Sequence, residues 1–230
     1  MNSARYALYF APEPDTALAR FGAWWFGRRE DSPHFEALSD LADLAPERRA
    51  ALVADARGYG LHATLKAPFR LREGCTVDEL AGALAAFVAG RAAIAAAPLV
   101  LAEIDGFVAL MPREPVPAIT ALAADCVAAF DRFRAPAAAT ELARRRSAGL
   151  TAAQDAYLLA WGYPYVMDEF RFHVTLTGRL DPVERQHIAG RLRPLLAPVL
   201  AAPLRLGSVC LFCQADATQP FVMRNRAALE

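Results

Sequence analysis

HATL at residues 62–65 and HVTL at residues 173–176 share the pattern His-x-Thr-Leu and decide how the rest of this sequence is interpreted. Each tetrapeptide lies in a short apolar run bounded by turn-forming residues, which is typical of a β-strand. Successive residues of a strand point to opposite faces of a sheet, so the histidine and threonine of each tetrapeptide share one face. The apolar residues share the other face, which can pack against helices. The sequence therefore predicts two strands that each have one polar and one apolar face.

The chain around the two tetrapeptides has the same order of elements twice. A helix with a strong N-terminal signal follows each tetrapeptide, opened by TVDE at residues 76–79 in the first copy and by DPVE at residues 181–184 in the second. Strands entered through Pro-Leu-x-Leu follow each helix, at residues 98–101 and 203–206. We interpret this order as a duplicated β-α-β unit, with two lobes related by a pseudo-two-fold axis.

The predicted fold class is α+β, with small, mainly antiparallel sheets around a central groove. One domain spans residues 1–230 and contains a first repeat at 58–111, a helical insert at 112–165 and a second repeat at 170–226. The hydrophobic patterns predict strands at 6–11, 61–65, 99–111, 171–177, 204–212 and 221–225, and helices at 15–27, 34–57, 77–90, 115–133, 141–146, 152–162 and 182–194. Pro68 is expected to end the first motif strand, and Gly106 to form a hairpin turn.

The composition excludes several classes of protein. Of the 230 residues, 55% are hydrophobic and 22% are charged, which is typical of a globular protein. Lysine plus arginine and aspartate plus glutamate both number 25, whereas a protein that coats long nucleic acid needs a basic face. No apolar stretch has the length of a membrane span, and the N-terminus lacks a signal-peptide pattern. We therefore expect a cytoplasmic monomer that binds neither membranes nor long nucleic acid.

The two polar faces carry the groups that a displacement at phosphorus requires. Histidine titrates near neutral pH, so one imidazole can deprotonate the attacking water while the other protonates the leaving oxygen. His62 and His173 are the catalytic candidates, and the hydroxyls of Thr64 and Thr175 can donate hydrogen bonds to the phosphoryl oxygens. This chemistry needs no metal, and the sequence shows no cluster with metal-ligand spacing. Because the repeat makes the histidines equivalent, the sequence does not say which one is the acid.

Four further residues are candidates for binding the phosphate or the rest of the substrate: Lys66, Arg171, Tyr163 and Tyr165. Lys66 and Arg171 lie on the predicted polar faces of the strands and could offset phosphate charge. A lysine at the end of a strand is more often a solvated edge charge, and the same simple interpretation applies to the arginine. The two tyrosines could stack on a base or a ribose, although aromatic residues in loops more often cap a core.

Four segments carry a resemblance to a known family: RYALYFAP at 5–12, HATLKAPF at 62–69, WGYPY at 161–165 and FHVTLTG at 172–178. Paired His-x-Thr-Leu tetrapeptides on a duplicated unit resemble the 2H phosphoesterase superfamily, which includes cyclic nucleotide phosphodiesterases and RNA 2′,5′-ligase-like proteins. Together the four segments resemble one branch, the DUF1045 family, which is labelled a phosphonate metabolism protein. The resemblance spans nearly the whole chain, and both histidines and both threonines of the family pattern are present.

The resemblance implies a LigT-like fold and a metal-independent hydrolase of the cyclic phosphodiesterase type that uses no cofactor. Its substrate would be a small cyclic phosphate or phosphodiester, of nucleotide or ribose type, that arises in phosphonate metabolism. Two alternatives stay open: 2′,5′ RNA ligation, which is the reverse chemistry in the same kind of site, and a non-catalytic module that binds a nucleotide or RNA. Intact histidines in both motifs favour an enzyme, since a binding module could lose either one.

Overall fold

The computed structural model describes residues 4–36, 38, 44–147 and 149–230. Its architecture is α+β, and every strand pairing in this part of the chain is antiparallel. The predicted fold class is confirmed at this level, as an α+β protein with small antiparallel sheets. Within the described ranges, no helix has both the length and the apolar character that a membrane crossing requires.

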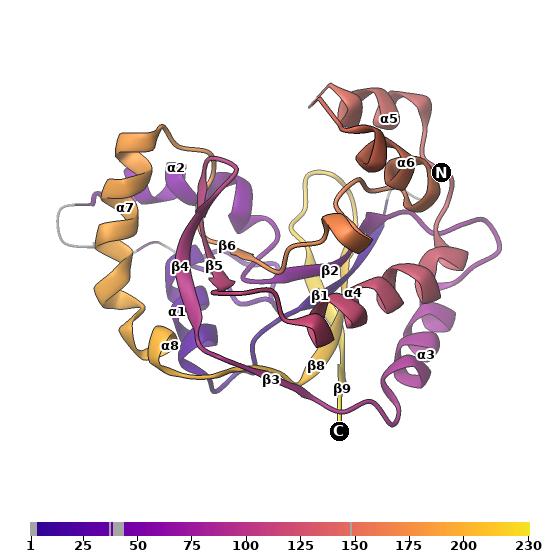
Figure 1. Cartoon of the computed structure of the whole chain (residues 1–230), viewed down its shortest axis with the longest axis horizontal. Coiled ribbons are helices and arrows are strands. Elements are labelled where there is room, and N and C mark those ends of the chain that lie inside the picture. Colours follow the sequence, from indigo (N-terminus) through magenta and orange to yellow (C-terminus); the bar gives the residue numbers. More distant parts are fainter. Residues whose placement is uncertain (1–3, 37, 39–43, 148) are drawn as a thin grey trace.

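The two motif strands lie at the edges of different sheets. The larger sheet has the order β2-β1-β8-β9 and the smaller one has the order β4-β5-β6 (Figure 1). A separate two-stranded ladder joins β3 to β7. The strands are β1 (Arg5–Phe10), β2 (Ala63–Phe69), β3 (Ile94–Ala96), β4 (Leu99–Ile104), β5 (Phe107–Pro112), β6 (Val174–Thr175), β7 (Leu204–Leu206), β8 (Ser208–Gln214) and β9 (Val222–Ala228).

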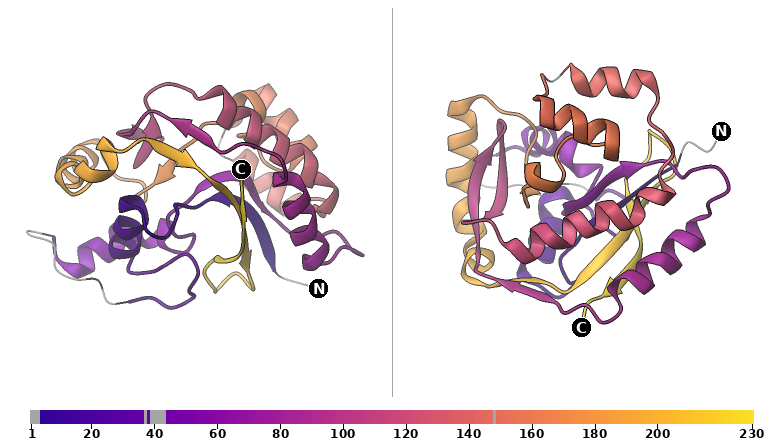
Figure 2. Two further views of the ribbon diagram at one scale, coloured as in Figure 1. Left: turned by 90° about the horizontal axis from the view of Figure 1, so that it is seen from below. Right: turned by 45° about the vertical axis from the view of Figure 1, so that its right-hand side comes forward.

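The described residues form eight α-helices. They are α1 (Ala17–Phe26), α2 (Pro46–Arg57), α3 (Val77–Val88), α4 (Pro117–Phe130), α5 (Ala139–Arg146), α6 (Ala152–Trp161), α7 (Pro182–Leu195) and α8 (Ala197–Ala201). The helices α3 and α4 pack on the larger sheet, whereas α7 and α8 pack on the smaller one (Figures 1 and 2). The helices α5 and α6 lie together at the upper right of Figure 1, apart from the other helices.

The local signals in the sequence begin the elements that were predicted from them. Capping boxes at Thr76 and Thr151 start α3 and α6, and the carboxylate of Asp181 accepts hydrogen bonds from the first turn of α7. Asp105 and Gly106 form the turn between β4 and β5, with φ values of 48° and 91°. These signals need only neighbouring residues, and all four predictions are confirmed.

The two predicted repeats exchange their hairpins. The β4–β5 hairpin belongs to the first repeat, but its strand β5 pairs with β6 of the second. The β8–β9 hairpin belongs to the second repeat, but its strand β8 pairs with β1, which lies beside β2 of the first. The two Pro-Leu-x-Leu segments therefore do not occupy equivalent strands, because Leu99 begins a hairpin strand whereas Leu204 begins β7, the partner of β3.

The first motif strand is longer than its pattern predicted. β2 does not end at Pro68 but continues to Phe69. Since β2 is an edge strand with one neighbour, a proline is tolerated there where its missing N–H would face away from β1.

The helix predicted at 34–57 is shorter than expected, because α2 begins at Pro46. Residues 37 and 39–43 of that prediction lie outside the described residues.

The second motif strand is shorter than its pattern predicted. The expected strand at 171–177 is reduced to Val174–Thr175. Beyond it, the N–H of Leu176 still donates to the carbonyl of Val108 at 2.9 Å. Side chains take the place of the return bond, because Trp25 Nε1 donates to the carbonyl of Leu176 at 2.7 Å and the N–H of Val108 donates to Thr177 Oγ1 at 3.0 Å. These bonds satisfy the backbone groups on which a longer strand would depend.

Candidate functional site

The two motif histidines are held in the same way. His62 directly precedes β2, and its Nδ1 lies 2.9 Å from the carbonyl oxygen of Gly60. His173 directly precedes β6, and its Nδ1 lies 2.8 Å from the carbonyl oxygen of Arg171. A carbonyl only accepts hydrogen bonds, so both contacts favour the tautomer that carries its proton on Nδ1. Each ring therefore leaves Nε2 free to exchange a proton with a bound molecule.

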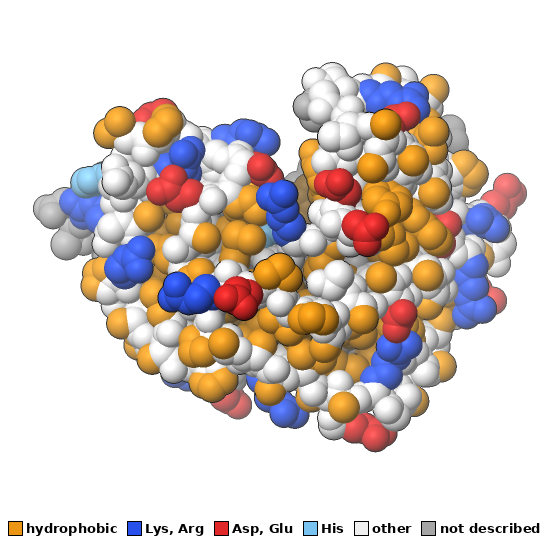
Figure 3. Space-filling model, viewed as in Figure 1, with side chains coloured by type: hydrophobic (Ala, Val, Ile, Leu, Met, Phe, Trp, Pro, Cys, Tyr) orange, Lys and Arg blue, Asp and Glu red, His pale blue; other side chains and the backbone are white. Residues whose placement is uncertain are grey.

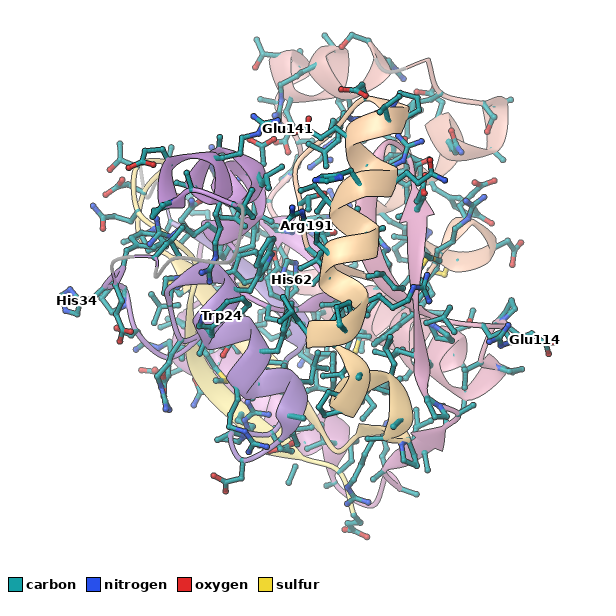
Figure 4. All side chains as sticks on the ribbon, turned by 90° about the vertical axis from the view of Figure 1, so that its left-hand side faces the viewer. Trp24, His34, His62, Glu114, Glu141 and Arg191 are labelled. Carbon is teal, nitrogen blue, oxygen red and sulfur yellow. The ribbon has the colours of Figure 1, made fainter. Side chains whose placement is uncertain are left out.

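The fold brings the two imidazoles near one another. Burial is the largest cause that lowers the pKa of His62, and the charge of His173 contributes to the same shift, so the two rings lie within range of electrostatic interaction. Both motif strands lie near the middle of the molecule in Figure 1, and the surface in Figure 3 is hollowed between the α5–α6 region and the α2–α7 region. Figure 4 shows His62 at the centre of the molecule, whereas His34 projects at its periphery.

Two tyrosines pack against the ring of His62. Tyr9, from β1, lies 4.0 Å away between ring centroids, and Tyr59 lies 5.8 Å away in a stacked arrangement. Tyr9 is fully buried and contacts Phe212 and Phe221, so one side of the imidazole rests on an apolar cluster. Although the residue is only half-buried, desolvation by its surroundings lowers the pKa of His62 to about 4. The ring is therefore neutral at neutral pH, which is the state of a proton acceptor.

His173 has different surroundings. It is more open to solvent, and its ring lies 6.0 Å from that of Phe107, between centroids. The equivalence of the two histidines in the sequence is thus broken by the tertiary structure. One imidazole is held against buried aromatic rings, and the other lies near the surface.

The two motif threonines have free hydroxyls. Thr64 and Thr175 are half-buried, and neither hydroxyl makes a hydrogen bond with another described residue. Thr177, two residues after Thr175, differs from both. Its hydroxyl accepts from the backbone N–H of Val108 and donates to the carbonyl of Gly178. Since a half-buried hydroxyl ordinarily finds a partner, these two are available to donate to a bound oxygen.

Lys66 lies in the interior, beneath α4. Its side chain is 3% exposed, and Nζ donates to the carbonyl of Val127 at 3.0 Å and to Asp131 Oδ1 at 3.3 Å. Burial lowers the pKa of the ammonium. The pairing of β2 with β1 shifts by one residue between Thr64 and Lys66, and such a bulge interrupts the alternation that placed both on one face. The ammonium is thus occupied by protein partners, unlike the threonine hydroxyls.

Of the other predicted binding residues, Arg171 lies two residues before His173, whereas Tyr163 lines a small pocket together with residues of β2, the first motif strand. Arg171 is exposed, and its carbonyl oxygen is the partner of His173. Tyr163 and Tyr165 contact one another edge to face, with centroids 5.6 Å apart, and Tyr165 is 43% exposed. Tyr163 also lies under the guanidinium of Arg145, 4.9 Å from the ring centroid, so a contact within the helical insert holds this aromatic pair.

The other two histidines, His34 and His187, and the two cysteines of the CLFC segment at 210–213 lie outside the two motifs. His34 is exposed, and His187 Nε2 accepts from Arg191 at 2.9 Å on the outer surface of α7. Cys210 is buried, whereas Cys213 is half-buried. Throughout the described ranges, no three His, Cys, Asp or Glu side chains cluster in a way that could hold a metal ion.

Sequence reasoning missed the residues that surround His62. Tyr9 lies in a strand that was predicted only as buried, and Tyr59 belongs to a Gly-Tyr-Gly turn that carries no specific motif. Arg28 and Glu30 contact the same turn from a segment about 30 residues upstream. The one available signal is that Tyr59 precedes the motif by three residues.

Comparison with known proteins places this chain among related sequences. A family model described as "Protein of unknown function (DUF1045)" matches residues 64–222. A protein of Janthinobacterium sp. (strain Marseille) named ribose 1,5-bisphosphate phosphokinase PhnN is 39% identical over 229 residues, which cover 98% of this chain and 51% of that protein. A protein of the same name from Laribacter hongkongensis (strain HLHK9) is 36% identical over 180 residues, which cover 78% of this chain and 41% of that protein. The chain spans about half the length of these curated relatives or less.

Proposed function

Because this chain belongs to the DUF1045 family, we propose a function for it from the chemistry of its two motifs. The chain acts as a metal-independent phosphoesterase of the 2H superfamily, with the duplicated LigT-like fold, on a small cyclic phosphate or phosphodiester. The observation that carries this proposal is the matched pair of imidazoles. Each is held through Nδ1 by the carbonyl two residues upstream, and the charge of one affects the pKa of the other.

The proposed reaction is an in-line displacement by water at phosphorus. His62, which is neutral at neutral pH, takes a proton from the water as its oxygen bonds to phosphorus. His173 gives a proton to the ester oxygen that leaves. The hydroxyls of Thr64 and Thr175, which lack partners among the described residues, donate to the non-bridging oxygens. The product is a phosphate monoester with a new free hydroxyl, and the two histidines have exchanged protonation states.

The names of the curated relatives support a ribose-type substrate. Both relatives are named for phosphorylation of ribose 1,5-bisphosphate. The present chain has one lysine, Lys66, and no Gly-x₄-Gly-Lys-Ser/Thr phosphate loop, so we assign the kinase activity to the rest of those longer proteins. A phosphoesterase in the same polypeptide can supply the substrate of that kinase. Opening of a 1,2-cyclic phosphate of ribose 5-phosphate at the 2-oxygen yields ribose 1,5-bisphosphate, and we place this step in phosphonate metabolism.

Turnover should survive chelation. We expect the best substrate among ribose 1,2-cyclic phosphate 5-phosphate, 2′,3′-cyclic nucleotides and a linear diester to be hydrolysed at the same rate with and without EDTA. The reason is that two imidazoles and two hydroxyls supply every group that the proposed displacement needs. Conversion of each diester to a monoester is followed directly by phosphorus-31 NMR, without a coupling enzyme that EDTA could inhibit. Activity that is lost in EDTA and restored by zinc or manganese contradicts the two-histidine mechanism.

The dependence of kcat/KM on pH should be asymmetric. A base must be neutral to act, so activity falls only as the pH drops through the pKa of His62, which is about 4. The alkaline limb reports loss of the proton that the acid must donate. The profile is measured from pH 3.5 to 9 with circular dichroism at each pH, so that acid unfolding is recognised. An acid limb near pH 6.5 in a folded sample contradicts the assignment of His62 as the base.

A further inference from the structure

The turn before the first motif has little conformational freedom. Gly60, whose carbonyl accepts from His62, has φ +75°, in the left-handed region that favours glycine. A Cβ atom at this position would lie 2.8 Å from Arg28 Nη2. Leu61, the next residue, is fully buried, and its N–H donates to Glu30 Oε1 at 3.2 Å. The turn is therefore bounded by Arg28 on one side and tied to Glu30 on the other.

Arg28 and Glu30 are themselves anchored. The Arg28 side chain is 1% exposed, and Nη1 donates to the carbonyl of Phe221 at 2.8 Å and to that of Ser32 at 3.0 Å. The carbonyl of Glu30 accepts from the N–H of Met223 at 2.7 Å. The segment is thus fastened to the strand β9 and its approach, which in turn bonds to Gly58 through the N–H of Phe221. The result is a bracket that joins residues 28–32, 58–61 and 221–223.

Burial of the Arg28 and Glu30 side chains removes two charged groups from water, which is unfavourable for folding. Burial lowers the pKa of Arg28 to about 10 and raises the pKa of Glu30, while the opposite charge of each opposes both shifts. Two nitrogens of Arg28, Nε and Nη2, are buried without a hydrogen-bond partner in the described part of the chain. Buried ionic groups are weak contributors to stability but can hold a neighbour in one arrangement. The arrangement that they hold is the turn whose carbonyl orients His62.

We infer that Glu30, supported by Arg28, is a positioning residue for His62. Its carboxylate holds the N–H of Leu61, so that the carbonyl of Gly60 stays directed at Nδ1 and Nε2 stays directed at the substrate. This inference rests on the proposed function insofar as it assigns His62 to catalysis. The contact itself is independent of any substrate. His173 donates the same kind of hydrogen bond to the carbonyl of Arg171, an exposed residue, so the bracket distinguishes the first motif from the second.

Three substitutions at Glu30 test the inference. Glu30→Gln keeps an oxygen acceptor at the same reach, so we expect the tautomer of His62 and kcat to stay close to those of the parent. Glu30→Asp keeps the charge but is one methylene too short to reach Leu61, and Glu30→Ala removes the acceptor. We expect both to lower kcat about 10- to 100-fold, because a small misplacement of a catalytic group has effects of this size. KM should change by less than about twofold, since Glu30 does not touch the substrate.

The tautomer of His62 distinguishes a positioning role from a merely structural one, because a general loss of stability would leave it unchanged. Nitrogen-15 NMR of the full chain with labelled histidine should show loss of the Nδ1–H form of His62 in Glu30→Asp and Glu30→Ala, its recovery in Glu30→Gln, and an unchanged His173. The matched control is Asp31→Ala, which removes an exposed neighbouring carboxylate that pairs with Arg29 and should change neither measurement. If Glu30→Ala does not fold, Glu30→Asp, which keeps the negative charge, decides the question.

The possible outcomes separate this inference from the proposed function. A folded Glu30→Asp with the parental tautomer of His62 overturns the positioning role. A shifted tautomer together with parental turnover also overturns it, because orientation of His62 would then not matter for the reaction. A shifted tautomer in a protein whose parent hydrolyses none of the phosphate esters supports the positioning contact and overturns the proposed function instead.

Discussion

Removal of either motif histidine should lower kcat by about 10²–10⁴-fold, because each substitution deletes one of the two groups that move a proton in the transition state. The variants are His62→Ala and His173→Ala, and their effects should not add in the double variant. Once one end of the displacement is unassisted, the other histidine has less to contribute. Steady-state kinetics on the best cyclic phosphate give kcat and KM, and thermal unfolding followed by circular dichroism confirms that each variant is folded.

The two histidine variants can be told apart by the leaving group. With a p-nitrophenyl phosphodiester the departing oxygen needs no proton, so His173→Ala should regain much of its loss whereas His62→Ala should not. The matched controls are His34→Ala and His187→Ala, which remove exposed imidazoles outside both motifs and should be nearly silent. The mechanism is wrong if a control loses as much activity as a motif variant. It is also wrong if a folded protein without both His62 and His173 keeps the turnover of the parent.

Removal of either motif hydroxyl should lower kcat by up to about 10²–10³-fold. Thr64→Val and Thr175→Val keep the shape and the strand propensity of threonine and delete one donor to the phosphoryl oxygens each. Because neither hydroxyl has a partner among the described residues, neither substitution should lower the free energy of unfolding measurably. The expected signature is therefore a large loss of kcat with an unchanged midpoint of denaturation.

Thr177→Val provides the opposite signature. Its hydroxyl accepts from the buried N–H of Val108, so the substitution leaves that donor unsatisfied and should lower the free energy of unfolding by about 1–3 kcal/mol. The kcat of the folded protein should change little. If Thr64→Val and Thr175→Val behave like Thr177→Val, losing stability but not kcat, their hydroxyls are structural and the proposed contact with phosphate fails.

The parts of the fold that were predicted correctly depend on neighbouring residues. A hydroxyl or carboxylate at the N-cap needs only the next three residues, so Thr76, Thr151 and Asp181 mark the starts of their helices. The turn at Asp105 and Gly106 needs only two residues that tolerate positive φ. Both motif histidines were identified as candidates on similar grounds, because His-x-Thr-Leu is a local pattern that occurs twice.

The predictions that failed depend on residues far away in the chain. The alternation of side chains along a strand predicted that Lys66 lies on the same face as Thr64. The pairing of β2 with β1 shifts between these residues, and the ammonium of Lys66 instead bonds to the carboxylate of Asp131 beneath α4. Alternation also predicted a long second motif strand, but Trp25, about 150 residues upstream, takes the carbonyl of Leu176. A period of two residues describes one strand in isolation and carries no information about either partner.

The sequence by itself determined the class of the fold, the starts of its capped helices and the pair of histidines with their threonines. Only the tertiary structure decided how the surroundings of the two half-buried imidazoles differ. His62 rests on Tyr9 of β1 and His173 lies near the surface beside Phe107, although the two tetrapeptides are nearly identical. The pKa of an imidazole follows from its desolvation and its neighbours, and these are supplied by segments that only the folded chain brings together. Equal motifs thus acquire unequal chemistry through their surroundings.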